Sequence, residues 1–316
     1  MNWRFDTLIF RRQRLAITSV CAFFSIKWRR LSDNLRGAIY MLLAAFFFSL
    51  MIVFIKIVSK SLNVTEILFF RQLITISIAA PVILSNLPHS LHTAFPKLQF
   101  LRVVIAFVAM LLGCSAFIYL PFAKVTVIMF SKTLFITVLA IVILGEVVGP
   151  RRWGAIIMGF LGVLIIAWPN DINNFTIYSV MAIMSSICVS AVVIIIRVIS
   201  RVDKPITIMT YQALGVGLLM VIPTIYFWKT PTLAEIVILT VIGICSTLGQ
   251  YFNILSLRVA EASFVGPFDY ARLIYSIAFG LLLFNEWPEQ RVFLGAALII
   301  SAAAYTLHRE QIKSKS

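Results

Sequence analysis

The sequence predicts an all-α integral membrane protein in which ten transmembrane helices form two inverted five-helix repeats. Three observations support this prediction: the composition, the spacing of the apolar runs, and a weak internal repeat. Hydrophobic residues make up 61% of the 316 residues, charged residues 12%, and the mean hydropathy is +1.01. Soluble domains average about 45–50% apolar and about 25% charged residues, so the composition excludes an ordinary soluble protein.

Ten apolar segments follow residue 36, and each is long enough, with tilt where needed, to cross about 30 Å of hydrocarbon. Short connections that contain proline or glycine separate them, as expected of turns. Long continuous apolar runs are typical of membrane helices, whereas a β-barrel shows alternating hydrophobicity. The expected cores are 37–55, 67–86, 103–120, 125–144, 153–168, 175–196, 206–228, 236–257, 262–284 and 292–307.

Residues 1–35 form a basic, aromatic extension that differs from the rest of the chain. Its uncharged run, 15–26, is shorter than the roughly 20 residues that a spanning helix needs. No small-residue cleavage site follows, which argues against a signal peptide. We expect a cytoplasmic, interfacial amphipathic segment; the alternative is a mis-chosen start codon, and we assign no function to this extension.

The basic residues predict the orientation, because cytoplasmic loops carry an excess of Lys and Arg. With the N-terminus in the cytoplasm, 19 of the 27 Lys and Arg residues lie at cytoplasmic ends and five at the opposite ends. The remaining three, Arg71, Lys132 and Arg272, lie inside predicted spans. Ten crossings therefore place both termini in the cytoplasm, and the net charge of +15 reflects topology and not a nucleic-acid surface.

The internal repeat relates the third to fifth segments to the eighth to tenth. A shift of 137 residues places 120–123 on 257–260 and Lys132 on Asp269. Because each repeat has an odd number of crossings, the second copy enters the membrane in the opposite sense. We expect repeats at 36–168 and 175–308, followed by a cytoplasmic tail at 309–316. Inverted repeats are typical of secondary transporters that bind substrate near the midplane.

Five stretches resemble the EamA-type drug/metabolite transporter superfamily over residues 35–310. The resemblance implies ten helices in two EamA repeats, and it is most similar to bacterial uptake carriers of the S-adenosylmethionine and riboflavin type. Family members often carry proline where Thr133 stands, so a kink in the fourth helix does not follow from the resemblance. The stretches are TEILFFRQ (65–72), YLPFAKV (119–125), LGEVVGPRRWGAIIMGFLGVLII (144–166), GPFDYARL (266–273) and FNEWPEQRVFLGAALII (284–300).

Charges inside the bilayer are costly and usually mark a substrate or ion pathway, so Lys132 and Asp269 are the leading candidates for a binding site. Three interpretations fit them: a pair that opens to bind a zwitterionic substrate, a permanent salt bridge between the repeats, or proton coupling at Asp269. Arg272 lies one helical turn from Asp269 and either neutralises it or contacts substrate. Arg71, about 7–8 Å into its span, suits a substrate carboxylate or phosphate, with Glu66 as its competing partner.

Polar and aromatic residues supply further candidate contacts. Gln250 and Asn253 lie one turn apart on one helix face and either hydrogen-bond a planar ligand or join neighbouring helices. Tyr270 supplies an aromatic surface for stacking. Other polar residues stand near helix ends, and for Arg102, Lys56 and Lys124 we expect snorkelling to the membrane surface.

Pro267, Glu146 and Glu286 are candidates for structural or gating roles. Pro267 removes a backbone donor just before Asp269, which either breaks the helix at a binding site or marks an ordinary first turn. Glu146 and Glu286 follow equivalent helices and serve either as gates or as acceptors that anchor loops.

The sequence carries no catalytic, nucleotide-binding or metal-ligand motif in context, so we expect neither an enzyme nor a cofactor. The leading hypothesis is a secondary transporter of a small polar metabolite, such as S-adenosylmethionine, in a bacterial inner membrane. This hypothesis also includes proton or sodium coupling, contact with membrane lipid, and a monomeric or homodimeric state. The alternatives are an exporter of amino acids or cationic drugs and a lipid-handling or accessory membrane protein.

Overall fold

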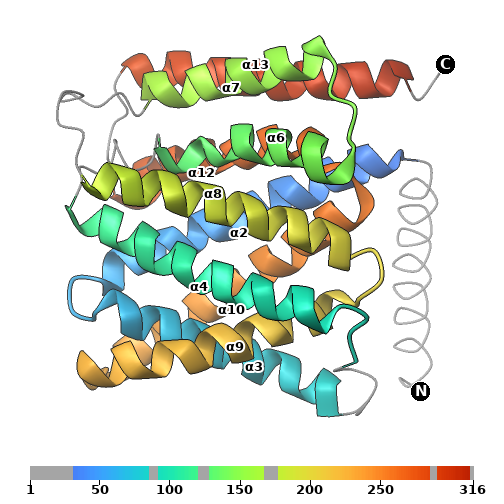
Figure 1. The fold of residues 1–316 in the computed structure, drawn as a ribbon. Helices are drawn as coiled ribbons and strands as arrows, with labels where there is room; N and C mark the ends of the chain where they lie inside the picture. Colours follow the sequence, from blue (N-terminus) through green and yellow to red (C-terminus); the bar gives the residue numbers. More distant parts are fainter. Residues whose placement is uncertain (1–30, 85–91, 120–127, 167–176, 285–289, 314–316) are drawn as a thin grey trace, which may run out of the picture.

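A computed structural model describes residues 31–84, 92–119, 128–166, 177–284 and 290–313. Within these ranges the chain is helical and forms no strand (Figure 1). Most of the extension predicted at 1–35 lies outside the described residues. In chain order the elements are α2 (Asp33–Val58), α3 (Val64–Leu84), α4 (Pro96–Tyr119), α6 (Lys132–Leu144), α7 (Pro150–Ile166), α8 (Ile177–Ile199), α9 (Pro205–Tyr226), α10 (Leu233–Val259), α11 (Ala262–Val265), the 3₁₀ helix η1 (Gly266–Tyr270), α12 (Ala271–Phe284) and α13 (Gln290–Lys313).

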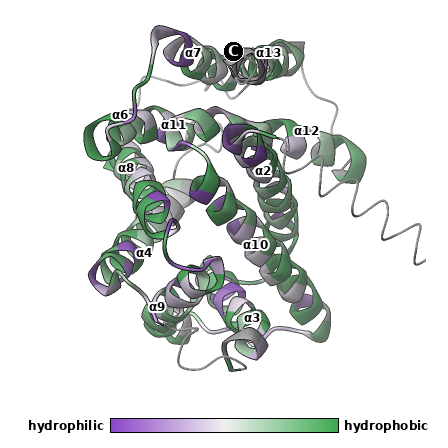
Figure 2. Cartoon of the chain, turned by 90° about the vertical axis from the view of Figure 1, so that its right-hand side faces the viewer, coloured by the Kyte–Doolittle hydropathy of each residue, from purple (hydrophilic) through white to green (hydrophobic). Residues whose placement is uncertain are grey.

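The predicted membrane architecture is confirmed. With α11, η1 and α12 counted as one crossing, the described helices form ten crossings. Six of them, α2, α3, α4, α8, α9 and α10, are long and apolar enough to span a bilayer by length and composition. Ile128–Leu144 and Phe293–Thr306 are shorter apolar helices. Hydrophobic residues cover most of the length of the helices in Figure 2, as a lipid environment requires.

The packing of the helices repeats in the second half of the chain. α2 packs against α10 as α8 packs against α4, and α3 packs against α10 as α9 packs against α4. Likewise α6 contacts α8, and its counterpart α12 contacts α2. In the pairs α3–α9 and α7–α13, each helix packs against its own counterpart in the other half. These two pairs lie at opposite edges of the molecule (Figure 1). The two halves are therefore related by a pseudo-twofold axis that passes through these two pairs.

The ninth crossing corrects one prediction, because the segment expected at 262–284 does not form one continuous helix. The short helix α11 passes into η1 at Gly266, and the α-helical pattern resumes only with α12 at Ala271. Pro267 has no backbone N–H to donate, and a 3₁₀ segment inside a helix often marks a functional hinge. Asp269 lies within this irregular segment.

The fourth crossing is also irregular, although it carries Thr133 at the position where the resemblance leads us to expect a proline. A turn at Ser131 separates residues 128–130 from α6. The Ser131 hydroxyl donates to the carbonyl of Ile128 at 2.5 Å, and the Ser131 N–H donates to the same carbonyl at 3.1 Å. A serine thus supplies the local bonding that interrupts this helix, directly before Lys132.

Tyr270 shows how closely α7 approaches the broken crossing. The tyrosine is fully buried against Val163 and Ile299. A Cβ atom at Gly159 would lie 2.7 Å from Cδ2 of the Tyr270 ring, which is closer than real contacts allow. Only glycine at this position leaves room for the ring.

We expect Gly159→Ala to lower the thermal stability of the purified protein by about 1–3 kcal/mol, because the added methyl overpacks the rigid ring. Gly154→Ala on the same helix is the matched control, since a Cβ there meets nothing within 4 Å. Thermal unfolding in detergent measures both. Equal stability of the two variants would contradict the close approach of Gly159 and Tyr270.

Candidate functional site

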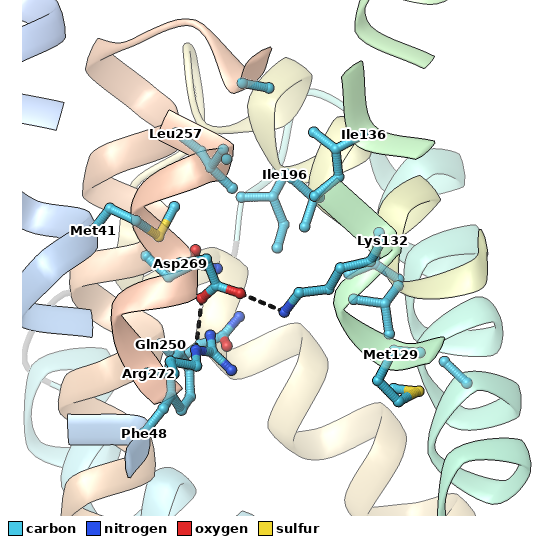
Figure 3. A pocket seen from close by; sticks show the side chains of 18 of the residues that line it. Met41, Phe48, Met129, Lys132, Ile136, Ile196, Gln250, Leu257, Asp269 and Arg272 are labelled. Carbon is cyan, nitrogen blue, oxygen red and sulfur yellow. Dashed lines mark ion pairs between the residues drawn. The ribbon is translucent and has the colours of Figure 1, made fainter. Parts of the chain in front are cut away.

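A cavity of about 340 Å³ lies between the two repeats, and described residues from every crossing except α7 and α13 line it (Figure 3). Ligand pockets have volumes of about 300–1,000 Å³, so this cavity holds a small metabolite. Aliphatic side chains, Phe48 and the methionines Met41, Met110 and Met129 form most of its wall. Its polar and charged lining residues are Arg71, Lys132, Ser185, Gln212, Gln250, Asn253, Asp269 and Arg272.

A cluster of three charged side chains occupies one wall of the cavity. Nζ of Lys132 lies 2.6 Å from Oδ2 of Asp269, and Nε of Arg272 lies 2.6 Å from Oδ1 of the same carboxylate. Figure 3 shows Lys132 reaching across the cavity toward Asp269, with Arg272 beside the carboxylate. We call these three residues the charged triad. One carboxylate therefore serves two cations, one from each repeat.

Burial makes this pairing energetically necessary. The side chains of Asp269, Lys132 and Arg272 are 8%, 14% and 22% exposed. An isolated charge at such a site pays a desolvation cost of several kcal/mol, which only a close, hydrogen-bonded partner offsets. Removal of one partner leaves an uncompensated buried charge, so the triad holds the two repeats together at the cavity.

The repeat symmetry explains why Lys132 and Asp269 meet. They occupy equivalent positions on the fourth and ninth crossings, and the pseudo-twofold axis brings equivalent parts of these crossings, α6 and η1, into contact. Like charges at such positions would repel each other across the axis, whereas opposite charges attract. Both residues also stand at irregular backbone, beside Ser131 and within Gly266–Tyr270.

Two further contacts hold Arg272 in place. Its guanidinium carbon lies 4.2 Å from the centroid of the Phe48 ring on α2, a cation–π geometry. The hydroxyl of Ser49 donates to the Arg272 carbonyl at 3.0 Å. The guanidinium is thus stacked on one face, and its orientation relative to Asp269 is set by both α2 and α12.

A chain of polar contacts leads from the cavity to α4 and corrects the prediction for Arg102. This arginine is fully buried and does not snorkel: it donates to Oε1 of Gln212 at 3.1 Å and to the carbonyl of Ile208 at 2.5 Å. Gln212 also accepts from Nε2 of Gln250 at 3.3 Å. Gln212 was missed by sequence reasoning because no charge or repeat signal distinguishes it.

The other predicted contacts divide between the cavity and the packed interior. Asn253 and Arg71 line the cavity, as Gln250 does. Glu66 does not depend on Arg71, because its carboxylate accepts from the backbone N–H groups of Asn63, at 3.1 Å, and Lys229. Tyr270, expected to stack on ligand, is not among the residues that line the cavity and packs against Val163 of α7 and Ile299 of α13. Lys56 is exposed near a helix end, whereas Lys124 lies outside the described residues.

Glu146 anchors the start of the ninth crossing. Its carboxylate accepts from the backbone N–H groups of Ala262 at 3.0 Å and Ser263 at 3.1 Å, and from the Ser263 hydroxyl. The turn at Gly145, whose φ of 66° favours glycine, directs Glu146 out of α6 toward α11. Glu286, its counterpart, lies outside the described residues. Pro267 stands inside η1, immediately after Gly266 of the cavity wall.

Ten apolar crossings in two inverted repeats, closed around a charged cavity between the repeats, define a polytopic membrane transporter. The EamA-like transporter family matches residues 35–168 and 176–307. The chain therefore belongs to the EamA-like transporter family.

Named relatives cover most of the chain at low identity. The S-adenosylmethionine uptake transporter of Rickettsia bellii (strain RML369-C) is 27% identical over 81% of this chain and 88% of its own length. The riboflavin transporter of Vibrio cholerae serotype O1 is 28% identical over 89% and 96%, and a pseudopaline exporter of Pseudomonas aeruginosa is 25% identical over 84% and 94%. One solved crystal structure has a TM-score of 0.76 at 16% identity over 87% of this chain and 98% of its own, which shows the fold alone.

We expect Arg102→Ala to lower stability by about 1–3 kcal/mol, because the Ile208 carbonyl and Gln212 lose a buried donor. The exposed Arg201→Ala is the matched control and should stay within about 0.5 kcal/mol of the parent protein. Thermal unfolding measures both variants. A stable Arg102→Ala protein would place that side chain at the membrane surface after all.

We expect Glu146→Ala to loosen the start of α11, since two backbone donors and one hydroxyl lose their acceptor there. Amide hydrogen exchange should rise at residues 262–265 relative to the parent protein, while α9 keeps its protection. Glu235→Ala, which removes a capping box on α10, is the control for the loss of an acidic cap elsewhere. Unchanged exchange at 262–265 would contradict an anchoring role for Glu146.

Proposed function

We propose that the protein is a secondary transporter that moves a small polar organic metabolite across a bacterial inner membrane by alternating access. The observation that carries this proposal is the ion pair between Lys132 of the first repeat and Asp269 of the second, inside a metabolite-sized cavity. Rocking of the repeats changes the distance between these residues, and a ligand between them competes for the same charges. The pair thus links ligand binding to the relative position of the repeats.

Contacts between the repeats lie at the end of the cavity where α2 begins and α10 ends. The Ser256 hydroxyl donates to the Gly37 carbonyl at 2.7 Å, and the Glu261 N–H donates to Oδ1 of Asn34 at 3.3 Å. Arg152 pairs with Glu261 at the same end, and Glu146 binds α11. Opening of the cavity toward this side must break these contacts. With both termini in the cytoplasm, this is the cytoplasmic gate.

The relatives supply the first substrates to test. S-adenosylmethionine and riboflavin are proposed as probes because relatives of similar length carry those names, and uptake is the proposed direction. An exporter of amino acids or cationic drugs is the alternative, because a relative with comparable coverage is named an exporter. Proton or sodium coupling and a monomeric or homodimeric state belong to the proposal as the second stage of testing.

The test is transport into proteoliposomes, with radiolabelled S-adenosylmethionine and riboflavin, by the parent protein, Lys132→Gln, Asp269→Asn and the charge-swapped Lys132→Asp/Asp269→Lys. We expect each variant to insert into the membrane but to transport at least about tenfold more slowly, a barrier change of about 1.4 kcal/mol. If Lys132 and Asp269 form only a permanent structural salt bridge, the charge swap should restore both stability and transport. Full transport by either single variant would remove the triad from the mechanism.

A further inference from the structure

The charges on the cavity wall do not balance. Four of the described lining residues are charged, namely Arg71, Lys132, Asp269 and Arg272, and only Asp269 is acidic. Within the charged triad, one carboxylate pairs with two cations at 2.6 Å each, which leaves a surplus of one positive charge at neutral pH. A surplus charge at 8–22% exposure is costly unless something of opposite sign joins it.

The six other acidic residues whose side chains the structure describes do not supply that charge. None of them lines the cavity, and each has bonds elsewhere. Glu66, Glu146 and Asp203 accept from backbone N–H groups of other elements, Glu235 closes a capping box, and Asp33 and Glu261 pair with arginines near helix ends.

Arg272 presents the surplus positive charge of the triad to the cavity. Its Nε lies 2.6 Å from Oδ1 of Asp269, and no described residue accepts a hydrogen bond from its two terminal nitrogens. Phe48 covers one face of the guanidinium, so the edge that carries these nitrogens remains for a ligand. Figure 3 shows this end of Arg272 beside Gln250 on the cavity wall. Planar N–H pairs of this kind match the two oxygens of a carboxylate or phosphate.

We propose that the transported substrate must carry an oxyanion, a carboxylate or a phosphate, which binds between Lys132 and Arg272 and completes the charge balance of the triad. The inference rests on the proposed function and adds the substrate class to it. Arg272 is then the residue that determines specificity. Zwitterions with a carboxylate are accepted, whereas cations without an anionic group, including quaternary-ammonium drugs, are excluded.

Matched probe pairs test the requirement directly. Each pair differs in one anionic group: methionine and methioninamide, S-adenosylhomocysteine and its methyl ester, flavin mononucleotide and riboflavin. Binding to the purified full-length chain in lipid nanodiscs is measured by thermal shift and by titration calorimetry. In the pair that binds, we expect the anionic member to have a Kd lower by about tenfold or more. Preference for a carboxylate pair or for the phosphate pair decides which oxyanion the site takes.

Variants of the triad test whether the surplus positive charge, and not a change in the fold, sets the preference for the anionic probe. Arg272→Gln leaves the Lys132–Asp269 pair intact but cancels the surplus, so the two members of a pair should bind equally. Arg272→Lys keeps the positive charge and should restore the preference for the anionic member. The double variant Lys132→Gln/Asp269→Asn keeps the surplus charge on Arg272 and should also retain this preference. Lys204→Gln, which removes an exposed cation outside the cavity, is the control and should match the parent protein.

The outcomes distinguish this inference from the proposed function. Equal binding of both members by the parent protein, or an undiminished preference in Arg272→Gln, overturns the oxyanion requirement and leaves the transporter in place. No binding of any of the six probes by folded protein, together with no transport in proteoliposomes, overturns both.

Discussion

The structure depends on the cost of placing charge inside a membrane protein. Lys132 and Asp269 are buried on different repeats, and each is tolerable there only because the other lies 2.6 Å away. The repeats therefore cannot take arbitrary relative positions without exposing one charge to a low-dielectric surrounding. Arg272 makes the arrangement asymmetric, because a second cation shares the single carboxylate. A ligand that rebalances this cluster changes the energy that holds the repeats together.

Irregular backbone accompanies these charges in both repeats. Continuous helices satisfy all their own N–H and C=O groups, so a break within the hydrocarbon region is tolerated only where protein or a cavity surrounds it. The break at Ser131 and the 3₁₀ segment Gly266–Tyr270 both meet this condition, and one uses a serine hydroxyl where the other uses a proline. Different local chemistry thus produces the same feature at equivalent positions of the repeat.

The family membership and the site answer different questions. Relatives of comparable length are named for S-adenosylmethionine uptake, riboflavin transport and pseudopaline export, so the fold is compatible with several cargoes and both directions. What distinguishes one member is therefore the set of side chains on the cavity wall. In this chain that wall combines methionines, which adapt to ligand shape, with the charged triad and the Gln212–Gln250 pair.

The sequence by itself determined the membrane class, the ten crossings and the repeat, and it singled out Lys132 and Asp269 while leaving their role open, because hydropathy, charge in apolar runs and repeat equivalence are local or periodic signals. Tertiary structure alone decided the burial of Arg102, the inclusion of Gln212 in the site, the turn of Tyr270 away from the cavity and the anchoring of α11 by Glu146. Each depends on which helix face meets a neighbour distant in sequence. Periodicity fixes the faces of a helix but not its partner, since many partners bury the same apolar stripe equally well.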